Sequence, residues 1–174
     1  MKTRNPIRRA FTLIEILAVV TILGLTSAII LPQLSSHGDL DAASAARSIT
    51  ADLLYAQSLS IASGNMTYVV FDSANGKYDL MSAVSPSNVI LTHPVLHAPY
   101  EVVFGNGALK NVTMSSVSFD GQTTVAFDSL GVPYSYNAGT QTTSALVAGS
   151  VVLQSGNATL TVSVQPYSGE IKVQ

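Results

Sequence analysis

The chain has 174 residues, no cysteine and a formal net charge of −2 at neutral pH. The lack of cysteine excludes disulfides and thiol-based redox chemistry. The small negative charge excludes the strongly basic composition typical of nucleic-acid-binding domains, so we predict no nucleic acid partner.

An apolar segment from Phe11 to Leu31 follows a basic leader and contains Glu15 as its single charged residue. A helix of this length rises by about 1.5 Å per residue and spans roughly 30 Å, which is enough to cross a membrane. The apolar region of a cleavable secretory signal has only about 7 to 15 residues. We therefore interpret residues 11–32 as a retained transmembrane helix.

The charges on either side of this helix predict its orientation. Half of the eight basic residues lie in the leader, residues 1–10, and the next basic residue is Arg47. These four leader residues are Lys2, Arg4, Arg8 and Arg9. By the positive-inside rule, the leader stays in the cytoplasm and the bulk of the chain lies outside it.

Glu15 is not explained by a plain anchor, because an ionisable group in the hydrocarbon costs about 2.5 to 3.5 kcal/mol on insertion scales. One interpretation is that its carboxylate reaches the lipid headgroups at the cytoplasmic end of the helix. The other interpretation is that a cation at the same depth in the membrane pairs with the carboxylate of Glu15. Cleavage between Ala10 and Phe11 would create that cation, the new amino group of Phe11, for the Glu15 of a neighbouring helix.

The stretch Arg8-Arg9-Ala10-Phe11-Thr12-Leu13-Ile14-Glu15 resembles the N-terminal signal of type IV pilins and type II secretion pseudopilins. Gly24 and Pro32 fall where these proteins commonly carry a helix-loosening glycine and a proline that ends the hydrophobic stretch. The chain departs from the family at Ala10, where a glycine is nearly always found.

This resemblance implies a processed filament subunit. A prepilin peptidase would cleave between Ala10 and Phe11, Phe11 would be N-methylated, and the chain would be stored in the bacterial inner membrane. An inner-membrane assembly platform would extract it into a filament of other pilin or pseudopilin subunits. There Glu15 would neutralise the amino terminus of an adjacent subunit.

Residues 33–63 are predicted to form a hinge and an amphipathic helix outside the membrane. Pro32 and Gly38 weaken a helix, so we expect a kink or partial melting between anchor and head. From Asp39 to Ser63, small and apolar residues recur at helical spacing, and Gly64 provides a stop. One broad apolar face packed on the head's own sheet is expected from Ala46, Ile49, Leu53, Leu54, Ala56, Ser60 and Ile61.

Beyond Gly64 the pattern changes to the alternation typical of strands. Residues 66–71 and 77–81 are expected to form a hairpin around Asn75-Gly76. Further strands are expected at 100–104, 112–119, 124–127, 150–153, 158–164 and 170–173, with the last three in a meander. Residues 64–174 are thus predicted to form one β-rich globular head.

Three stretches resemble the GspH/FimT group of minor pseudopilins and minor pilins. They are the helix Arg47 to Ser63 with Tyr55-Ala56-Gln57-Ser58, the turn Phe127-Asp128-Ser129-Leu130-Gly131, and the ending Val164 to Val173. The resemblance implies an α+β fold, in which a long N-terminal transmembrane helix continues into an extracytoplasmic helix packed on an antiparallel, β-sandwich-like head. It also implies a place at or near a filament tip.

Candidate chemistry in the head is sparse. His93 and His97 are four residues apart, but Pro94 favours a loop and no third ligand with metal-site spacing follows. Asp72 and Asp79 flank a turn and could share a calcium ion, but they lack the spacing of a calcium loop. No Ser, His and Asp pattern indicates a triad. We predict no catalytic residue, no enzyme activity, no cofactor and no metal site.

Two functions of different classes follow. In the first, the chain is a minor pseudopilin or pilin, a structural subunit assembled through its N-terminal helix. In the second, it is a membrane-anchored binding module that never polymerises and uses the 82–99 loop as its ligand surface. Only the first function requires Glu15 for incorporation into a filament.

Overall fold

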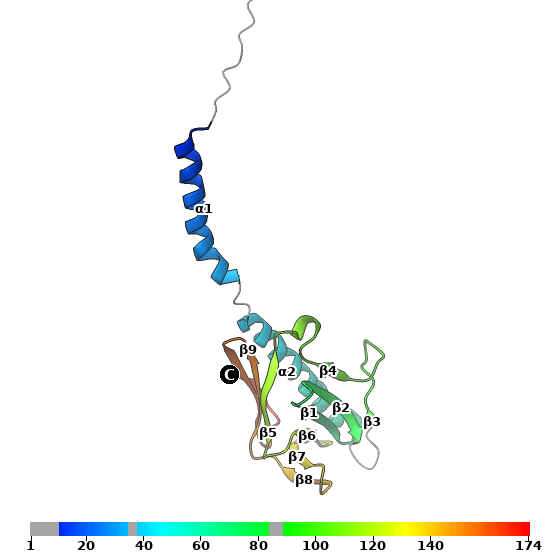
Figure 1. The fold of residues 1–174 in the computed structure, drawn as a ribbon. Helices are drawn as coiled ribbons and strands as arrows, with labels where there is room; N and C mark the ends of the chain where they lie inside the picture. The colour runs from blue at the N-terminus through cyan, green and yellow to red at the C-terminus, as the bar shows by residue number, and fades with distance from the viewer. Residues whose placement is uncertain (1–10, 35–37, 84–88) are drawn as a thin grey trace, which may run out of the picture. The chain divides into compact units, whose positions relative to one another are not determined.

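The computed structural model describes residues 11–34, 38–83 and 89–174 (Figure 1). It divides into two compact units, Met1–His37 and Gly38–Gln174. The leader, the centre of the expected hinge at 35–37 and part of the 82–99 loop lie outside the described residues. The expectations for these segments stay predictions.

Helix α1, Leu13–Leu34, forms most of the described part of the first unit. Leucine, isoleucine, valine and alanine dominate its sequence, and the straight-chain and small members of this set favour helix. The helix continues through Gly24 and includes Pro32 before it ends at Leu34.

Helix α2, Gly38–Ser63, opens the second unit. Its first turn contains Asp39 and Asp41, where the helix dipole favours negative charge. It ends at Gly64, which has a φ of +70° and donates its N–H to the Ser60 carbonyl at 2.9 Å. The buried face of α2 consists of Ala42, Ala45, Ala46, Ile49, Leu53, Ala56 and Ser60.

The expected breadth of this face was wrong at two positions. Leu54 and Ile61 are 46% and 54% exposed. Each follows a buried residue, and one step along a helix turns the side chain by about 100°. The apolar contact with the sheets is therefore a narrow stripe.

The first sheet is antiparallel, with the strand order β3-β2-β1-β6-β7-β8 and with β4 also paired to β2. Its strands are β1 Thr67–Asp72, β2 Lys77–Ala83, β3 Val89–Ile90, β4 Glu101–Val103, β6 Thr124–Phe127, β7 Pro133–Asn137 and β8 Thr142–Ala145. The predicted hairpin is confirmed as β1 and β2, with Val69 opposite Leu80, and Gly76 in its turn has a φ of +62°.

The second sheet is also antiparallel and has the order β11-β10-β9-β5. Its strands are β5 Thr113–Phe119, β9 Gly149–Ser155, β10 Ala158–Val164 and β11 Ile171–Val173. The predicted meander is confirmed as β9 to β11. A short 3₁₀ helix, η1 Gly107–Leu109, precedes β5.

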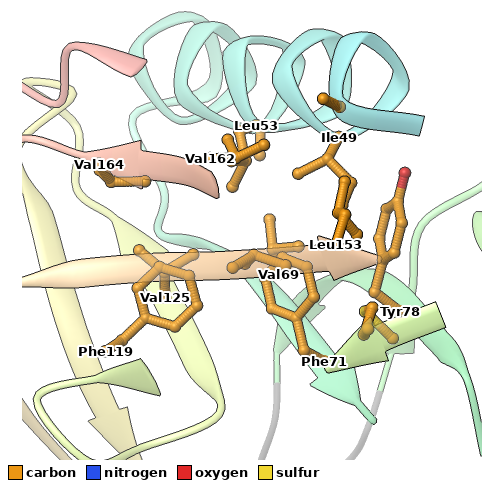
Figure 2. Packing of buried hydrophobic residues seen from close by; sticks show 14 of the residues in the cluster. Ile49, Leu53, Val69, Phe71, Tyr78, Phe119, Val125, Leu153, Val162 and Val164 are labelled. Atoms are coloured by element: carbon orange, nitrogen blue, oxygen red, sulfur yellow. The ribbon is translucent and has the colours of Figure 1, made fainter. Parts of the chain in front are cut away.

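The core lies where α2 and both sheets meet. Figure 2 shows Leu53 pointing from the helix toward Val162, and Ile49 pointing toward Leu153. Phe71 of β1 stacks on Phe119 of β5, with ring centroids 5.6 Å apart, so these aromatic rings join one sheet to the other. This arrangement confirms the α+β fold with a sandwich-like head.

Within the described residues, β3, β7 and β8 are strands that the sequence did not predict. β3 has two residues. β7 begins with Pro133 and alternates tyrosine with polar residues, and β8 reads Thr-Thr-Ser-Ala without a large apolar side chain. β7 thus carries a strand signal in its alternate tyrosines, whereas β3 is too short to show a period and β8 is held by its pairing with β7.

Candidate assembly site

Helix α1 exposes its apolar side chains. The part from Leu13 to Ile30 is long and apolar enough to cross a membrane, and none of it is buried within the fold. Phe11, just before the helix, is 75% exposed. Such a surface is stable in lipid or against other helices, since water would have to solvate a continuous apolar cylinder.

The hydroxyl groups of α1 are satisfied by the helix itself. Thr21, Thr26 and Ser27 each donate to a backbone carbonyl three or four residues earlier, at 2.7 to 3.0 Å. They therefore need no partner from outside the helix when the segment enters an apolar medium.

Glu15 differs from these hydroxyl groups. Within residues 11–34 its carboxylate has no hydrogen-bond or ion-pair partner. Its backbone N–H donates to Thr12 Oγ1 at 3.3 Å, so Thr12 caps the helix and Glu15 lies in the first turn, where negative charge is favoured. These local contacts fix the start of α1 and leave the carboxylate available to another molecule.

Of the other predicted assembly residues, Gly24 and Pro32 lie along the same helix, Phe11 lies just before it, and Ala10 lies outside the described residues. Gly24 is in the middle of α1, where a methyl group added to it would meet no atom within 4 Å. Pro32 lies in the last turn. Among the described residues, Gly24 therefore has no packing role.

In the head, Asp52 of α2 accepts two tyrosine hydrogen bonds that the sequence did not predict. Tyr78 donates to Oδ2 at 2.5 Å and Tyr100 donates to Oδ1 at 2.9 Å. Burial first, and then the charge of Asp52, raises the pKa of Tyr78. Burial and the Asp52 hydrogen bond likewise raise the pKa of Tyr100. Both hydroxyls therefore remain protonated donors.

Gln57 of α2 joins two of the stretches that suggested the GspH/FimT group. Its Nε2 donates to the carbonyl of Gly131 at 2.9 Å and to that of Ser168 at 3.4 Å. Gly131 and Gly169 have φ values of +80° and +66°, which few other residues tolerate. The side chain of Gln57 thus holds the β6–β7 and β10–β11 turns against the helix.

His93 and His97 form contacts within their own loop and with Tyr100. His93 Nδ1 accepts the backbone N–H groups of Val95 and Leu96 at 3.1 and 3.2 Å, and its ring lies 4.5 Å from that of Tyr100. His97 Nδ1 lies 3.1 Å from the Val95 carbonyl. Among the described residues, no cluster of three or more His, Cys, Asp or Glu side chains could hold a metal ion.

The two candidate calcium carboxylates have separate partners. Hydrogen bonds from Asn75 lower the pKa of Asp72, with Nδ2 to Oδ2 at 2.6 Å. Asp79 lies 3.5 Å from Lys77 Nζ, and burial raises its pKa. Its Oδ1 is buried and has no hydrogen-bond partner in the described part of the chain.

Two family models match the sequence. The model for the type II transport protein GspH matches residues 45–169, and the model for the prokaryotic N-terminal methylation motif matches residues 6–31. The first covers most of α2 and most of the head, and the second covers most of α1. No curated protein sequence matches the chain.

Two solved structures are similar to the chain. The minor pseudopilin EpsH from the type 2 secretion system of Vibrio cholerae has a TM-score of 0.54 and 11% identity, covering 77% of this chain and 96% of that one. The type IV minor pilin FimU of Pseudomonas aeruginosa has a TM-score of 0.49 and 15% identity, covering 76% and 87%. At 11% identity, the likeness to EpsH shows a shared fold.

The family match confirms the resemblance found in the sequence. Proteins of this class are structural and in general not enzymes, and they assemble with other pilin subunits after processing by a prepilin peptidase. Because the GspH model spans most of the head and the methylation motif spans the anchor, the chain belongs to the GspH family and is a membrane-anchored structural subunit of the pilin and pseudopilin class.

Proposed function

We propose that the chain is cleaved between Ala10 and Phe11, N-methylated at Phe11, and moved from the bacterial inner membrane into a pseudopilus or pilus by an assembly platform. The parts of the chain are then a leader at 1–10, an assembly helix at 11–32, a hinge and helix at 33–63, and a head at 64–174. Glu15 pairs with the amino terminus of an adjacent subunit.

The charge distribution supports this topology. Four basic residues precede the apolar helix, which keeps the leader cytoplasmic and directs the head across the membrane. Ala10 is small, which suits a peptidase that normally meets glycine there. Gly24 weakens the helix interior by about 1 kcal/mol relative to alanine, so α1 can adjust when it leaves the lipid for the filament.

The observation that carries the proposal is that the carboxylate of Glu15 has no partner among residues 11–34, whereas the hydroxyl groups of Thr21, Thr26 and Ser27 bond to backbone carbonyls of their own helix. In lipid this group costs about 2.5 to 3.5 kcal/mol by insertion scales. A cation at the same depth on another subunit removes much of that cost. Insertion therefore creates a driving force for association, and the freed terminus of Phe11 supplies the cation.

Substitution of Glu15 tests the proposal. We expect Glu15→Ala and Glu15→Gln to insert normally but to be incorporated into filaments at least about tenfold less, since each loss of 1.4 kcal/mol changes a partition tenfold. The measurement is the amount of the processed chain found in sheared filaments relative to the amount left in membranes.

Thr26→Ala is the matched control. In the parent chain, the hydroxyl of Thr26 bonds to carbonyls of its own helix. The variant should therefore be incorporated into filaments as well as the parent. Parent-like incorporation of both Glu15 variants would contradict the proposal and favour the non-polymerising binding module.

A further inference from the structure

The outer edge of β8 carries free backbone groups. β8 ends the first sheet beyond β7, and in the described part of the chain it pairs with that strand alone (Figure 1). All four of its residues, Thr142–Ala145, are exposed. One side of the strand is thus hydrogen-bonded and the other side faces solvent.

The register identifies the outward groups. Tyr134 lies opposite Ala145, and the Leu146 N–H donates inward to the Pro133 carbonyl at 3.3 Å. Along an antiparallel strand, the backbone N–H and C=O groups of successive residues point alternately toward the partner strand and away from it. The backbone groups of Ser144 therefore also face β7. Thr143 and Ala145 therefore present their N–H and C=O groups to solvent.

The other sheet edges have features that oppose pairing with another chain. β5 carries a bulge between Met114 and Ser116. β11 is short and contains Lys172, while β3 and β4 have only two and three residues. Bulges, lysines and short length are the common protections of edge strands. β8 is also short, with four residues, but it has no charge, no proline and no bulge.

Both ends of β8 are held in place. At one end, the two carboxylate oxygens of Asp120 accept the N–H groups of Val147 and Ala148, each at 2.9 Å. At the other end, Asn137 Oδ1 accepts the N–H groups of Gly139 and Thr140 at 2.9 and 3.2 Å. The edge is therefore pre-organised, which lowers the entropy lost when a partner binds.

A polar groove of about 400 Å³ lies along the same hairpin. It is lined mostly by hydroxyl and amide side chains, Gln122, Ser135, Asn137, Thr142 and Ser144, together with Asp120 and the apolar Ala145 and Val147. No basic residue lines the groove, and both oxygens of Asp120 are already engaged. Its chemistry suits uncharged polar side chains.

We propose that the outer edge of β8 accepts an extended segment from the head of a neighbouring pilin-type subunit. This segment adds a strand through the backbone groups of Thr143 and Ala145 and places alternate, uncharged polar side chains in the groove. In this mode the backbone provides affinity and the groove provides selectivity. The inference rests on the proposed function, because a filament is what brings a second head beside the first.

The test compares Thr143→Pro with Thr143→Ala in the full-length chain in cells that assemble the filament. Proline removes the outward N–H and is tolerated on an edge strand, whereas alanine keeps the N–H. We expect Thr143→Ala to be incorporated like the parent and Thr143→Pro at least about fivefold less. Parent-like incorporation of Thr143→Pro would overturn the inference.

Hydrogen exchange keeps the test independent of how the proline variant folds. In the parent chain, the N–H groups of Thr143 and Ala145 should exchange at least about tenfold more slowly in the filament than in detergent-extracted chain. Those of Ser144 and Leu146 should be slow in both. Equal rates for Thr143 in the two states, or protection already present in a detergent-solubilised dimer, would overturn the inference while leaving the proposed function intact. Absence of the parent from filaments would overturn both.

Discussion

The carboxylate of Asp52 binds two tyrosines from different segments. It accepts hydrogen bonds from the hydroxyl groups of Tyr78 in β2 and of Tyr100 just before β4. The ring of Tyr100 also stacks on that of Tyr55, with centroids 5.5 Å apart. Tyr78 is fully buried. A charged acceptor between two buried or half-buried donors contributes more than a neutral acceptor would.

Replacing Asp52 should therefore destabilise the head. We expect Asp52→Ala to lower the free energy of unfolding by about 2 to 4 kcal/mol, because each hydrogen bond to a charged group contributes about 1.5 to 3 kcal/mol and a buried hydroxyl is left unpaired. Chemical unfolding of the full chain in detergent, followed by tyrosine fluorescence, measures this, since the chain has no tryptophan.

Asp41→Ala provides the control on the same helix. The Asp41 carboxylate accepts Asn111 Nδ2 at 2.8 Å in an exposed position, so its loss should cost at most about 1 kcal/mol. Equal destabilisation by the two variants would show that the buried tyrosines do not matter.

The role of Glu15 was predictable from the sequence, whereas the role of Asp52 was not. The residues next to Glu15 in the chain are uncharged and mostly apolar, so the sequence alone indicates its environment. Asp52 lies 26 and 48 positions from the two tyrosines that it binds. Its role was not predicted because it depends on contacts that only the folded sheet creates.

The junction of α2 with two turns depends on the close approach of Gly169. A methyl group at this position would lie 2.4 Å from Gln57 Nε2 and 2.9 Å from the Gly131 carbonyl oxygen. The turn therefore needs glycine both for its positive φ and for space.

Gly169→Ala should cost more than its backbone conformation alone explains. We expect a loss of about 2 to 4 kcal/mol, of which about 1 kcal/mol reflects the left-handed conformation and the rest reflects crowding against Gln57. Gly156→Ala isolates the first part, because its φ is +57° and no atom lies within 4 Å of an added methyl group. If denaturant titrations gave equal losses in the free energy of unfolding for the two variants, the predicted crowding at Gly169 would be wrong.

Elements with their own apolar pattern were predictable, and elements defined by neighbours were not. The long helix, the β1–β2 hairpin and the C-terminal meander were predicted because apolar residues recur at the appropriate period. β8 was not predicted because its threonines, serine and alanine carry no apolar period, and β7 was not predicted although its tyrosines alternate with polar residues, because this pattern is only five residues long and begins at a proline. Leu54 and Ile61 were assigned to the buried face because hydrophobicity alone does not set the width of a packed stripe.

Two lysines of the head pair with nearby carboxylates. Lys77 contacts Glu101 at 2.6 Å, and Lys172 contacts Glu170 at 3.1 Å, which leaves little positive charge to attract phosphate groups. The basic leader contains half of the lysine and arginine residues of the unprocessed chain. Its removal therefore makes the net charge of the protein more negative.

Intact mass spectrometry of membrane-extracted protein tests this processing. We expect the mass of residues 11–174 plus one methyl group, because the methylation motif begins before the proposed cleavage site at Ala10. Ala10→Gly should give the same product, and a bulky side chain in Ala10→Leu should leave the leader attached. A native chain that retains residues 1–10 would rule out Phe11 as the partner of Glu15.

The hydrogen bond from Gln57 to Ser168 joins positions 111 residues apart. In the proposed orientation, the anchor enters the membrane before the turn that contains Ser168 crosses it. This contact can form only after Ser168 has crossed, because a long-range contact needs both of its ends on the same side. We therefore expect a copy that stalls before this point to keep an open core and to be degraded faster than a translocated copy.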